Sequence, residues 1–317
     1  MATGTVLPPE RAAPSVAPGL AVLPPRLSAV PAAGARRAPG ELLWRDHRGR
    51  PGLLGQLLVV GVFLGGYDLI RDVVQQKAAV ALTHASSVFS FERHLGVGVE
   101  HALNARLGTG ILGGLAGAYY DSAHWFVTMG VLAWLWVRRP TAYRVWRDLL
   151  LWLNVVGLVV YWVYPLAPPR LTPGHGFTDT VARTHALGGW STTITHAADQ
   201  YAAMPSLHIA WALWSSAAVL AAARHRLRSR RGEPRTAVRR LALGGVLVAA
   251  AAYPLLTTVV ILATANHWVV DALAGAALLG ATAAVLVPAR AALDRGAGAG
   301  GGAVGPGAVV RVMSRRR

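Results

Sequence analysis

The sequence predicts an all-α fold in which a bundle of helices crosses a membrane several times. Three observations support this prediction. The chain of 317 residues is 54% hydrophobic and only 14% charged, whereas soluble domains are about one quarter charged. The apolar residues form long blocks, most of which approach the roughly 20 residues that a spanning helix needs. The basic residues gather between these blocks, as they do in the cytoplasmic loops of membrane proteins.

Six apolar blocks are the predicted transmembrane helices, and polar tails flank them. The blocks cover residues 53–67, 111–137, 149–165, 205–223, 241–264 and 267–287. The first block is short, although its Gly61-x-x-x-Gly65 spacing would let a neighbouring helix approach closely. Residues 1–50 are rich in Pro, Ala and Arg, and residues 291–317 are basic and rich in Gly and Ala, so both tails are predicted to be disordered. The membrane domain is therefore expected over residues 51–290.

The distribution of charge predicts the orientation of this bundle. With both termini in the cytoplasm (N-in, C-in), 25 of the 31 lysines and arginines fall on the inner side. Topology in the cell membrane thus accounts for the formal net charge of +17, and nucleic-acid binding is not expected. The absence of cysteine excludes disulfides, thiolate nucleophiles and cysteine-bound zinc.

Two segments of the membrane domain are expected outside the bilayer core, on its outer side. Residues 74–107 carry charged side chains among apolar ones at helical spacing, which indicates one or two helices lying at the interface. Residues 166–204 are expected to form an outer loop, and this loop carries Arg170 after two prolines that would stiffen it.

Two histidine motifs lie at the predicted starts of the fourth and sixth helices, and therefore at the outer surface. They read Met204-Pro205-Ser206-Leu207-His208 and Asn266-His267-Trp268-Val269-Val270-Asp271. Helix N-termini offer unpaired amide N–H groups and a partial positive charge, which together favour an anion. Asn266 is the expected cap of the last helix. Ionisable groups at the rim of a bilayer are usually functional, so these motifs and Arg170 are predicted to form one site.

The spacing of the second motif suggests a nucleophile. His267 and Asp271 are four residues apart and would share a helix face, so the carboxylate could accept a hydrogen bond from Nδ1 and leave Nε2 free to attack. The alternative is a structural His–Asp pair. Arg170 could make paired hydrogen bonds to a phosphate, or it could be an interfacial arginine that contacts lipid headgroups.

Other residues near these motifs leave several alternatives open. His208 could instead be a helix-end histidine bonded to water, or a base for Ser206 in a serine hydrolase, although the chain lacks a Gly-x-Ser-x-Gly elbow around this serine. His124, close to Tyr120 at the outer end of the second helix, either lines a headgroup pocket or packs between helices.

The order Pro-Pro-Arg, Pro-Ser-Leu-His and Asn-His-Trp-x-x-Asp resembles the type 2 phosphatidic acid phosphatase superfamily. It is more closely similar to the branch that contains inositol phosphorylceramide synthase, an inositolphosphotransferase, and its bacterial relatives. The resemblance covers about residues 55–288. Four further residues, together with the segment Leu95-Gly96, fit that branch: Glu92, Glu100, Tyr120 and His124.

The resemblance implies a role for each motif residue. The third-motif histidine, His267, is the nucleophile, and Asp271 is its orienting carboxylate. The second-motif histidine, His208, is the acid. Ser206 and the first-motif arginine, Arg170, hold the phosphate. His124, Tyr120 and Asn266 are the candidate residues of a headgroup pocket.

The chain departs from the broad family pattern at three positions. Val163, Leu207 and Ile261 stand where the family usually has lysine, glycine and arginine. The loss of two cations weakens the expectation of a general phosphatase, whereas the inositolphosphotransferase-like branch tolerates it.

The expected activity is that of a metal-independent phosphatase or phosphotransferase without a cofactor. A lipid phosphate ester would react at the extracytoplasmic face through a phosphohistidine, and the acceptor would be inositol, another alcohol or water. One alternative is a simple phosphatase acting on a polyprenyl or diacylglycerol phosphate. A second is a metal site made of His208, His267 and Asp271. A third is a transporter or a catalytically inactive lipid-binding protein.

Overall fold

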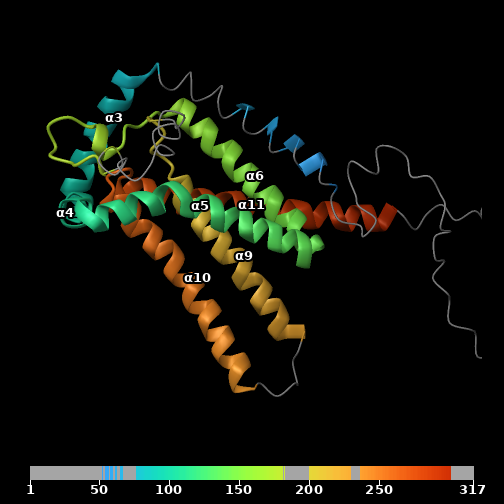
Figure 1. Ribbon diagram of the computed structural model, residues 1–317. Helices are drawn as coiled ribbons and strands as arrows, with labels where there is room; N and C mark the ends of the chain where they lie inside the picture. The colour runs from blue at the N-terminus through green and yellow to red at the C-terminus, as the bar shows by residue number, and fades with distance from the viewer. Residues whose placement is uncertain are drawn as a thin grey trace, which may run out of the picture.

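The computed structural model describes residues 76–180, 200–229 and 236–300, together with residue 182 and scattered positions between 52 and 66. Within these ranges the chain is helical, and β-structure is limited to one bridge between Leu166 and Ala202 (Figure 1). This confirms the predicted all-α fold. The predicted N-terminal tail lies outside the described residues, as do six of the fifteen residues of the first predicted transmembrane block (53, 57, 60, 63, 64 and 67).

Four of the described helices are long and apolar enough to cross a membrane, which indicates a multi-pass membrane protein. They are α6 (Pro140–Val163), α9 (Leu207–Ser229), α10 (Ala237–Ala263) and the part Val269–Ala292 of α11 (Val269–Gly300). Helix α5 (Gly110–Arg138) corresponds to the second predicted block, but polar residues between Tyr119 and His124 interrupt its apolar run. Six spanning helices and the N-in, C-in orientation remain predictions.

Several helix boundaries differ from those expected. Helix α6 begins at Pro140 instead of residue 149, because proline fits the first position of a helix, where its missing N–H has no partner to lose. Helix α11 continues past residue 291 to Gly300, into the segment predicted to be a disordered tail. Alanine has the highest helix propensity, and the alanine-rich sequence there extends the helix. The remainder of that tail lies outside the part of the chain that the structure describes.

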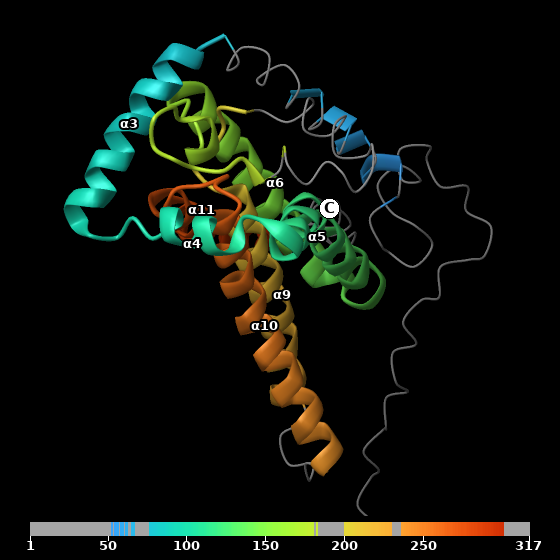
Figure 2. The ribbon, with the colours of Figure 1, turned by 60° about the vertical axis from the view of Figure 1, so that its left-hand side comes forward.

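The predicted interfacial segment contains two helices, α3 (Ala78–Leu95) and α4 (Glu100–Leu107). Helix α3 buries one face, which includes Ala81, Val88 and Glu92. Gly96 ends α3 with a φ of 65°, a left-handed conformation that favours glycine. Figures 1 and 2 show α3 and α4 at the end of the bundle where α11 begins.

Helix α9 lies at the centre of the bundle. It runs antiparallel to α10, and the two helices extend side by side in both views (Figures 1 and 2). Helices α5, α6 and α11 pack against α9 through a core that includes Leu135, Leu153, Trp214 and Leu278. Large apolar side chains such as Phe126 are exposed on the outer faces, as expected of surfaces that contact lipid.

Candidate active site

Three segments that are distant in the sequence meet at one end of the bundle. Leu166 donates its N–H to the carbonyl of Tyr201 (2.8 Å) and accepts from the N–H of Ala203 (3.2 Å). The N–H of Arg170 donates to the carbonyl of Ala265 (2.9 Å). These backbone bonds bring together the loop after α6, the approach to α9 and the turn before α11, so the three predicted motifs lie side by side.

His267 is buried at the centre of this arrangement. Its Nδ1 lies 2.9 Å from the carbonyl oxygen of Ala203 and 3.5 Å from Oδ2 of Asp271. A carbonyl only accepts, so Nδ1 carries the proton and donates it to Ala203, which leaves a lone pair on Nε2. The carbonyl, and not the carboxylate, is therefore the closer partner that selects this tautomer.

The two site histidines are in contact. Nε2 of His267 lies 3.4 Å from Nδ1 of His208, and the ring centroids are 5.4 Å apart. A tetrahedral phosphate does not fit between two nitrogens at this distance. Phosphate binding at Nε2 of His267 therefore requires the His208 ring to move aside.

Two carboxylates accept from backbone amides at the N-terminus of α11. The N–H of Trp268, which precedes the helix, donates to Oδ2 of Asp271 (2.9 Å), as in one half of a capping box. The N–H of Val270 donates to Oε1 of Glu92 in α3 (2.7 Å). The protein's own carboxylates thus occupy amides that the sequence offered as an anion site.

The predicted cap, Asn266, has a different role. The helix begins at Val269, and the turn before it places Asn266 outside the cap position. Its amide nitrogen donates to the hydroxyl of Thr264 (3.0 Å), and its oxygen accepts from Nε of Arg170 (2.8 Å). Asn266, which directly precedes His267, therefore links the arginine to the turn that carries this histidine.

The Arg170 guanidinium is held by a second partner as well. Its NH1 donates to Oδ2 of Asp179 (3.0 Å), and only 10% of its side chain is exposed. The sequence prediction missed Asp179, because a single acidic residue in a loop carries no pattern. This ion pair places the cation beside the site and neutralises part of its charge.

Two candidate headgroup residues pack against His208. The Tyr120 ring stacks on it at a centroid distance of 4.3 Å, and the His124 ring meets it edge-on, also at 4.3 Å. Nδ1 of His124 donates to the carbonyl of Tyr120 (3.0 Å). Nε2 of His208 is buried and has no hydrogen-bond partner in the described part of the chain. These contacts hold the ring from the side of α5.

Ser206 joins α9 to α11. Its N–H donates to the carbonyl of Asp271 (3.0 Å), and its hydroxyl accepts weakly from the N–H of Ile209 (3.5 Å), at the start of α9. A Cβ at Gly275 would lie only 2.2 Å from the carbonyl oxygen of Ser206. Glycine at this position therefore allows the two helices to approach, a requirement that the sequence alone did not reveal.

A buried pair of carboxyl groups lies behind the start of α11. Glu92 and Glu100 are almost completely buried, and one oxygen of each has no partner among the described residues. Burial raises the pKa of Glu92 to about 8, the N–H of Val270 opposes this shift, and the neighbouring Glu100 adds to it. The family resemblance included both residues without a role, and only the fold shows Glu92 beneath the His267 turn.

The three positions that depart from the family pattern lie in different surroundings. Ile261 is buried in a cluster with Ile209 and Leu262, so the usual arginine has no replacement there. Leu207 packs closely on Gly157, whose Cβ would lie 3.0 Å from the leucine side chain. Val163 is exposed at the end of α6. Arg170 is thus the cation that these motifs retain.

The arrangement provides a buried imidazole with a free ring nitrogen, a second imidazole beside it and a guanidinium held nearby. Within the described ranges, no three His, Asp or Glu side chains are grouped to hold a metal ion. Asp271 lies on the Nδ1 side of His267 and His208 on its Nε2 side, so these three residues surround the ring instead of meeting at one point.

A family model described as the PAP2 superfamily matches residues 86–230 and 236–285. The chain belongs to the PAP2 superfamily. This match confirms the superfamily that the motifs predicted, the type 2 phosphatidic acid phosphatases. It indicates phosphatase-type chemistry on lipid phosphates, in keeping with the apolar helices. No match was found among curated proteins or among solved structures.

Proposed function

We propose that this membrane protein transfers a phosphoryl group from a lipid phosphate ester through a phosphohistidine on His267. The observation that carries the proposal is the contact between Nε2 of His267 and Nδ1 of His208 (3.4 Å), formed where α9 and α11 begin. One imidazole there has a fixed tautomer, and the other is within reach of any group bound to it. This pair fits a nucleophile and an acid better than it fits a structural contact.

His267 acts as the nucleophile. Donation from Nδ1 to the Ala203 carbonyl keeps the lone pair on Nε2, and Asp271, at 3.5 Å, stabilises the positive charge that develops on the ring during attack. The Nε2–P bond forms as the bond between phosphorus and the lipid oxygen breaks.

His208 acts as the acid and then as the base. Its ring swings away from Nε2 of His267 when the phosphate enters, and its protonated form donates to the departing lipid oxygen. In the second step it accepts the proton of the attacking alcohol or water, whose oxygen bonds to phosphorus as the P–N bond breaks. Tyr120 and His124 guide this movement, because both rings pack against His208.

Arg170 and Ser206 hold the phosphate. A phosphate competes with Asp179 for the guanidinium, while Asn266 keeps Nε in place at 2.8 Å. With one retained cation, binding relies on this arginine and on polar groups at the start of α9. No step of this mechanism calls for a metal or another cofactor.

The choice of acceptor separates the two enzymatic candidates. The Pro-Ser-Leu-His spelling and the apolar surroundings of Ile261 favour the inositolphosphotransferase-like branch, with an alcohol as the acceptor. Transfer to water would instead make the protein a phosphatase for polyprenyl or diacylglycerol phosphates. In either case the charge distribution favours a site that faces the outer side of the cell membrane.

The test is to trap the intermediate. Full-length protein in detergent is mixed with a lipid phosphate that carries a labelled phosphoryl group and is quenched in alkali, which preserves phosphohistidine. We expect label on the wild-type protein, none on His267→Ala, and label on His94→Gln, which changes an exposed histidine of α3. Label on His267→Ala would refute the assignment of the nucleophile. Adding inositol or leaving it out then shows whether an alcohol or water takes the phosphoryl group.

A further inference from the structure

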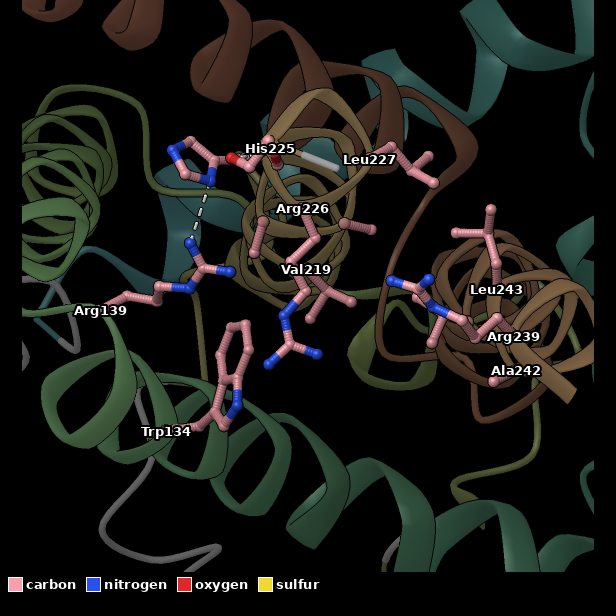
Figure 3. Close-up of a pocket in the computed structure, with 13 residues that line it drawn as sticks. Trp134, Arg139, Val219, His225, Arg226, Leu227, Arg239, Ala242 and Leu243 are labelled. Atoms are coloured by element: carbon pink, nitrogen blue, oxygen red, sulfur yellow. Dashed lines mark hydrogen bonds between the residues drawn. The ribbon is translucent and has the colours of Figure 1, made fainter. Parts of the chain in front are cut away.

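A second polar region lies at the other end of the bundle, around a cavity of about 600 Å³ between α5, α9 and α10 (Figure 3). His208 is the second residue of α9 and Arg226 is in its last turn, so the cavity is roughly 27 Å along the helix from the histidines. The site proposed above does not use any residue that lines this cavity.

The polar side chains that line the cavity are mostly cationic. Arg139, Arg226 and Arg239 border it, and no aspartate or glutamate does so within the described residues. Figure 3 shows the Arg226 guanidinium extending between Trp134 and Arg239. The Arg139 guanidinium lies 3.1 Å from Nδ1 of His225. A phosphate that entered the cavity would be attracted to each of these three cations.

The remaining wall is apolar and belongs to spanning helices. Val219 and Ala222 of α9 face Leu243 and Val246 of α10 across the cavity. Arg226 is in the last turn of α9 and Arg239 is in the first turns of α10, so the cations mark the depth at which both helices leave the apolar layer. A ligand that satisfies the whole lining needs an anionic head and an apolar body.

We infer that this cavity binds an anionic phospholipid, with the phosphate among Arg139, Arg226 and Arg239 and the acyl chains along α9 and α10. Basic pockets between transmembrane helices bind phospholipid headgroups in this way. Trp134 fits the same position, because an indole ring prefers the boundary between headgroups and acyl chains. The lipid would bridge α5, α9 and α10 at the end opposite the histidines.

The experiment measures lipid binding to the full-length protein in neutral detergent by native mass spectrometry. The probes are phosphatidylglycerol, phosphatidylcholine and inorganic phosphate. The test variant is Arg226→Gln/Arg239→Gln. The matched control is Arg228→Gln/Arg240→Gln, which removes the same charge from the same helices at exposed positions that do not line the cavity.

We expect the wild-type protein and the control to bind phosphatidylglycerol with affinities within about twofold of each other, and the test variant to bind it about 25-fold more weakly, at about fivefold per arginine. The inference fails if both double variants lose affinity equally, because general surface charge then explains the binding. It also fails if phosphatidylcholine binds as tightly, or if inorganic phosphate does. The thermal unfolding midpoint of each variant checks its fold, and Arg226→Gln alone, at an exposed position, serves if the double variant unfolds. These readouts do not depend on turnover, so they are independent of the proposed function.

Discussion

The polar residues at the two ends of α9 have different surroundings. At its start, His208 is enclosed by Tyr120, His124 and His267. At its end, Arg226 is exposed beside a cavity bordered by other cations. At the first end specific partners restrain each ring, whereas at the second end three arginines border one cavity.

The two environments suit the two ends to different roles. Buried polar groups need partners, and at the histidine end these partners set the tautomer of His267 and limit where the His208 ring can move, which suits transfer chemistry. The three arginines at the other end border an apolar cavity, which suits a charged headgroup with acyl chains. Changes at the histidine end should therefore alter turnover or the docking of α11, and changes at the cationic end should alter lipid affinity.

The largest expected effect is the loss of turnover in His267→Ala. Removal of the nucleophile should lower kcat by about 10⁴-fold or more, because the other groups have no phosphoryl intermediate to act on. Release of phosphate from a lipid phosphate in detergent measures this effect. Arg226→Gln/Arg239→Gln should keep turnover within about threefold of wild type. Comparable losses of turnover in His267→Ala and in Arg226→Gln/Arg239→Gln would contradict the assignment of catalysis to the histidine end alone.

The next effect is expected at Arg170. Arg170→Gln should lower kcat/KM by about 100-fold, since one charge-assisted contact to the phosphate is lost. Steady-state kinetics with a lipid phosphate checks this value. Arg106→Gln, which alters an exposed arginine of α4, is the control and should change kcat/KM by less than about threefold. Equal losses in the two variants would mean that Arg170 acts only as surface charge.

The close approach of α9 and α11 can be tested with a pair of glycines. Gly275→Ala places a Cβ 2.2 Å from the Ser206 carbonyl, so the helices must separate, with a loss of about 1–3 kcal/mol and a lower unfolding midpoint. Gly280→Ala, also in α11, meets nothing within 4 Å and should be neutral or slightly stabilising. Thermal unfolding in detergent compares them. Equal midpoints would contradict the tight contact at the histidine end.

The smallest effect is a dependence on pH that comes from Glu92. Its pKa is raised from 4.5 to about 8 in the folded protein, mainly by burial, so between these values the folded state binds more protons than the unfolded state. The contribution of Glu92 to stability is therefore largest below about pH 4.5 and is lost as the pH rises toward 8.

The matched variant is Glu92→Gln, which stays neutral and keeps an oxygen that accepts from the N–H of Val270. Its unfolding midpoint, measured from pH 5 to 8, should fall by a few degrees less than that of the wild type. Parallel curves for the two proteins would show that Glu92 is not the group that titrates.

Sequence patterns predicted the helical architecture and the members of the candidate site because both are encoded locally. Hydropathy blocks mark α6, α9, α10 and α11, since each helix must present an apolar surface to its surroundings. The motifs predicted that His208, His267 and Arg170 would meet, and the fold brings their segments together. Their catalytic roles remain predictions that the experiments above test.

Other features could not be read from a pattern because they depend on how distant segments dock. Asp179 pairs with Arg170 across a loop, and Glu92 reaches Val270 from another helix. The prediction that Asn266 caps α11 was wrong, because the preceding turn shifts the start of the helix to Val269 and directs Asn266 toward Arg170. Helix and capping propensities depend on neighbouring residues in the sequence, so they do not predict contacts between distant segments.

Composition and motif spelling are properties of short segments, so the apolar helices and the two histidine motifs follow from the sequence alone. The tertiary structure was needed to show that the carbonyl of Ala203 selects the His267 tautomer, and that Gly275 leaves room for the carbonyl of Ser206. It alone also gathered the arginines around a cavity at the far end of α9. Each of these results depends on the distance between atoms that lie far apart along the chain, and packing sets that distance.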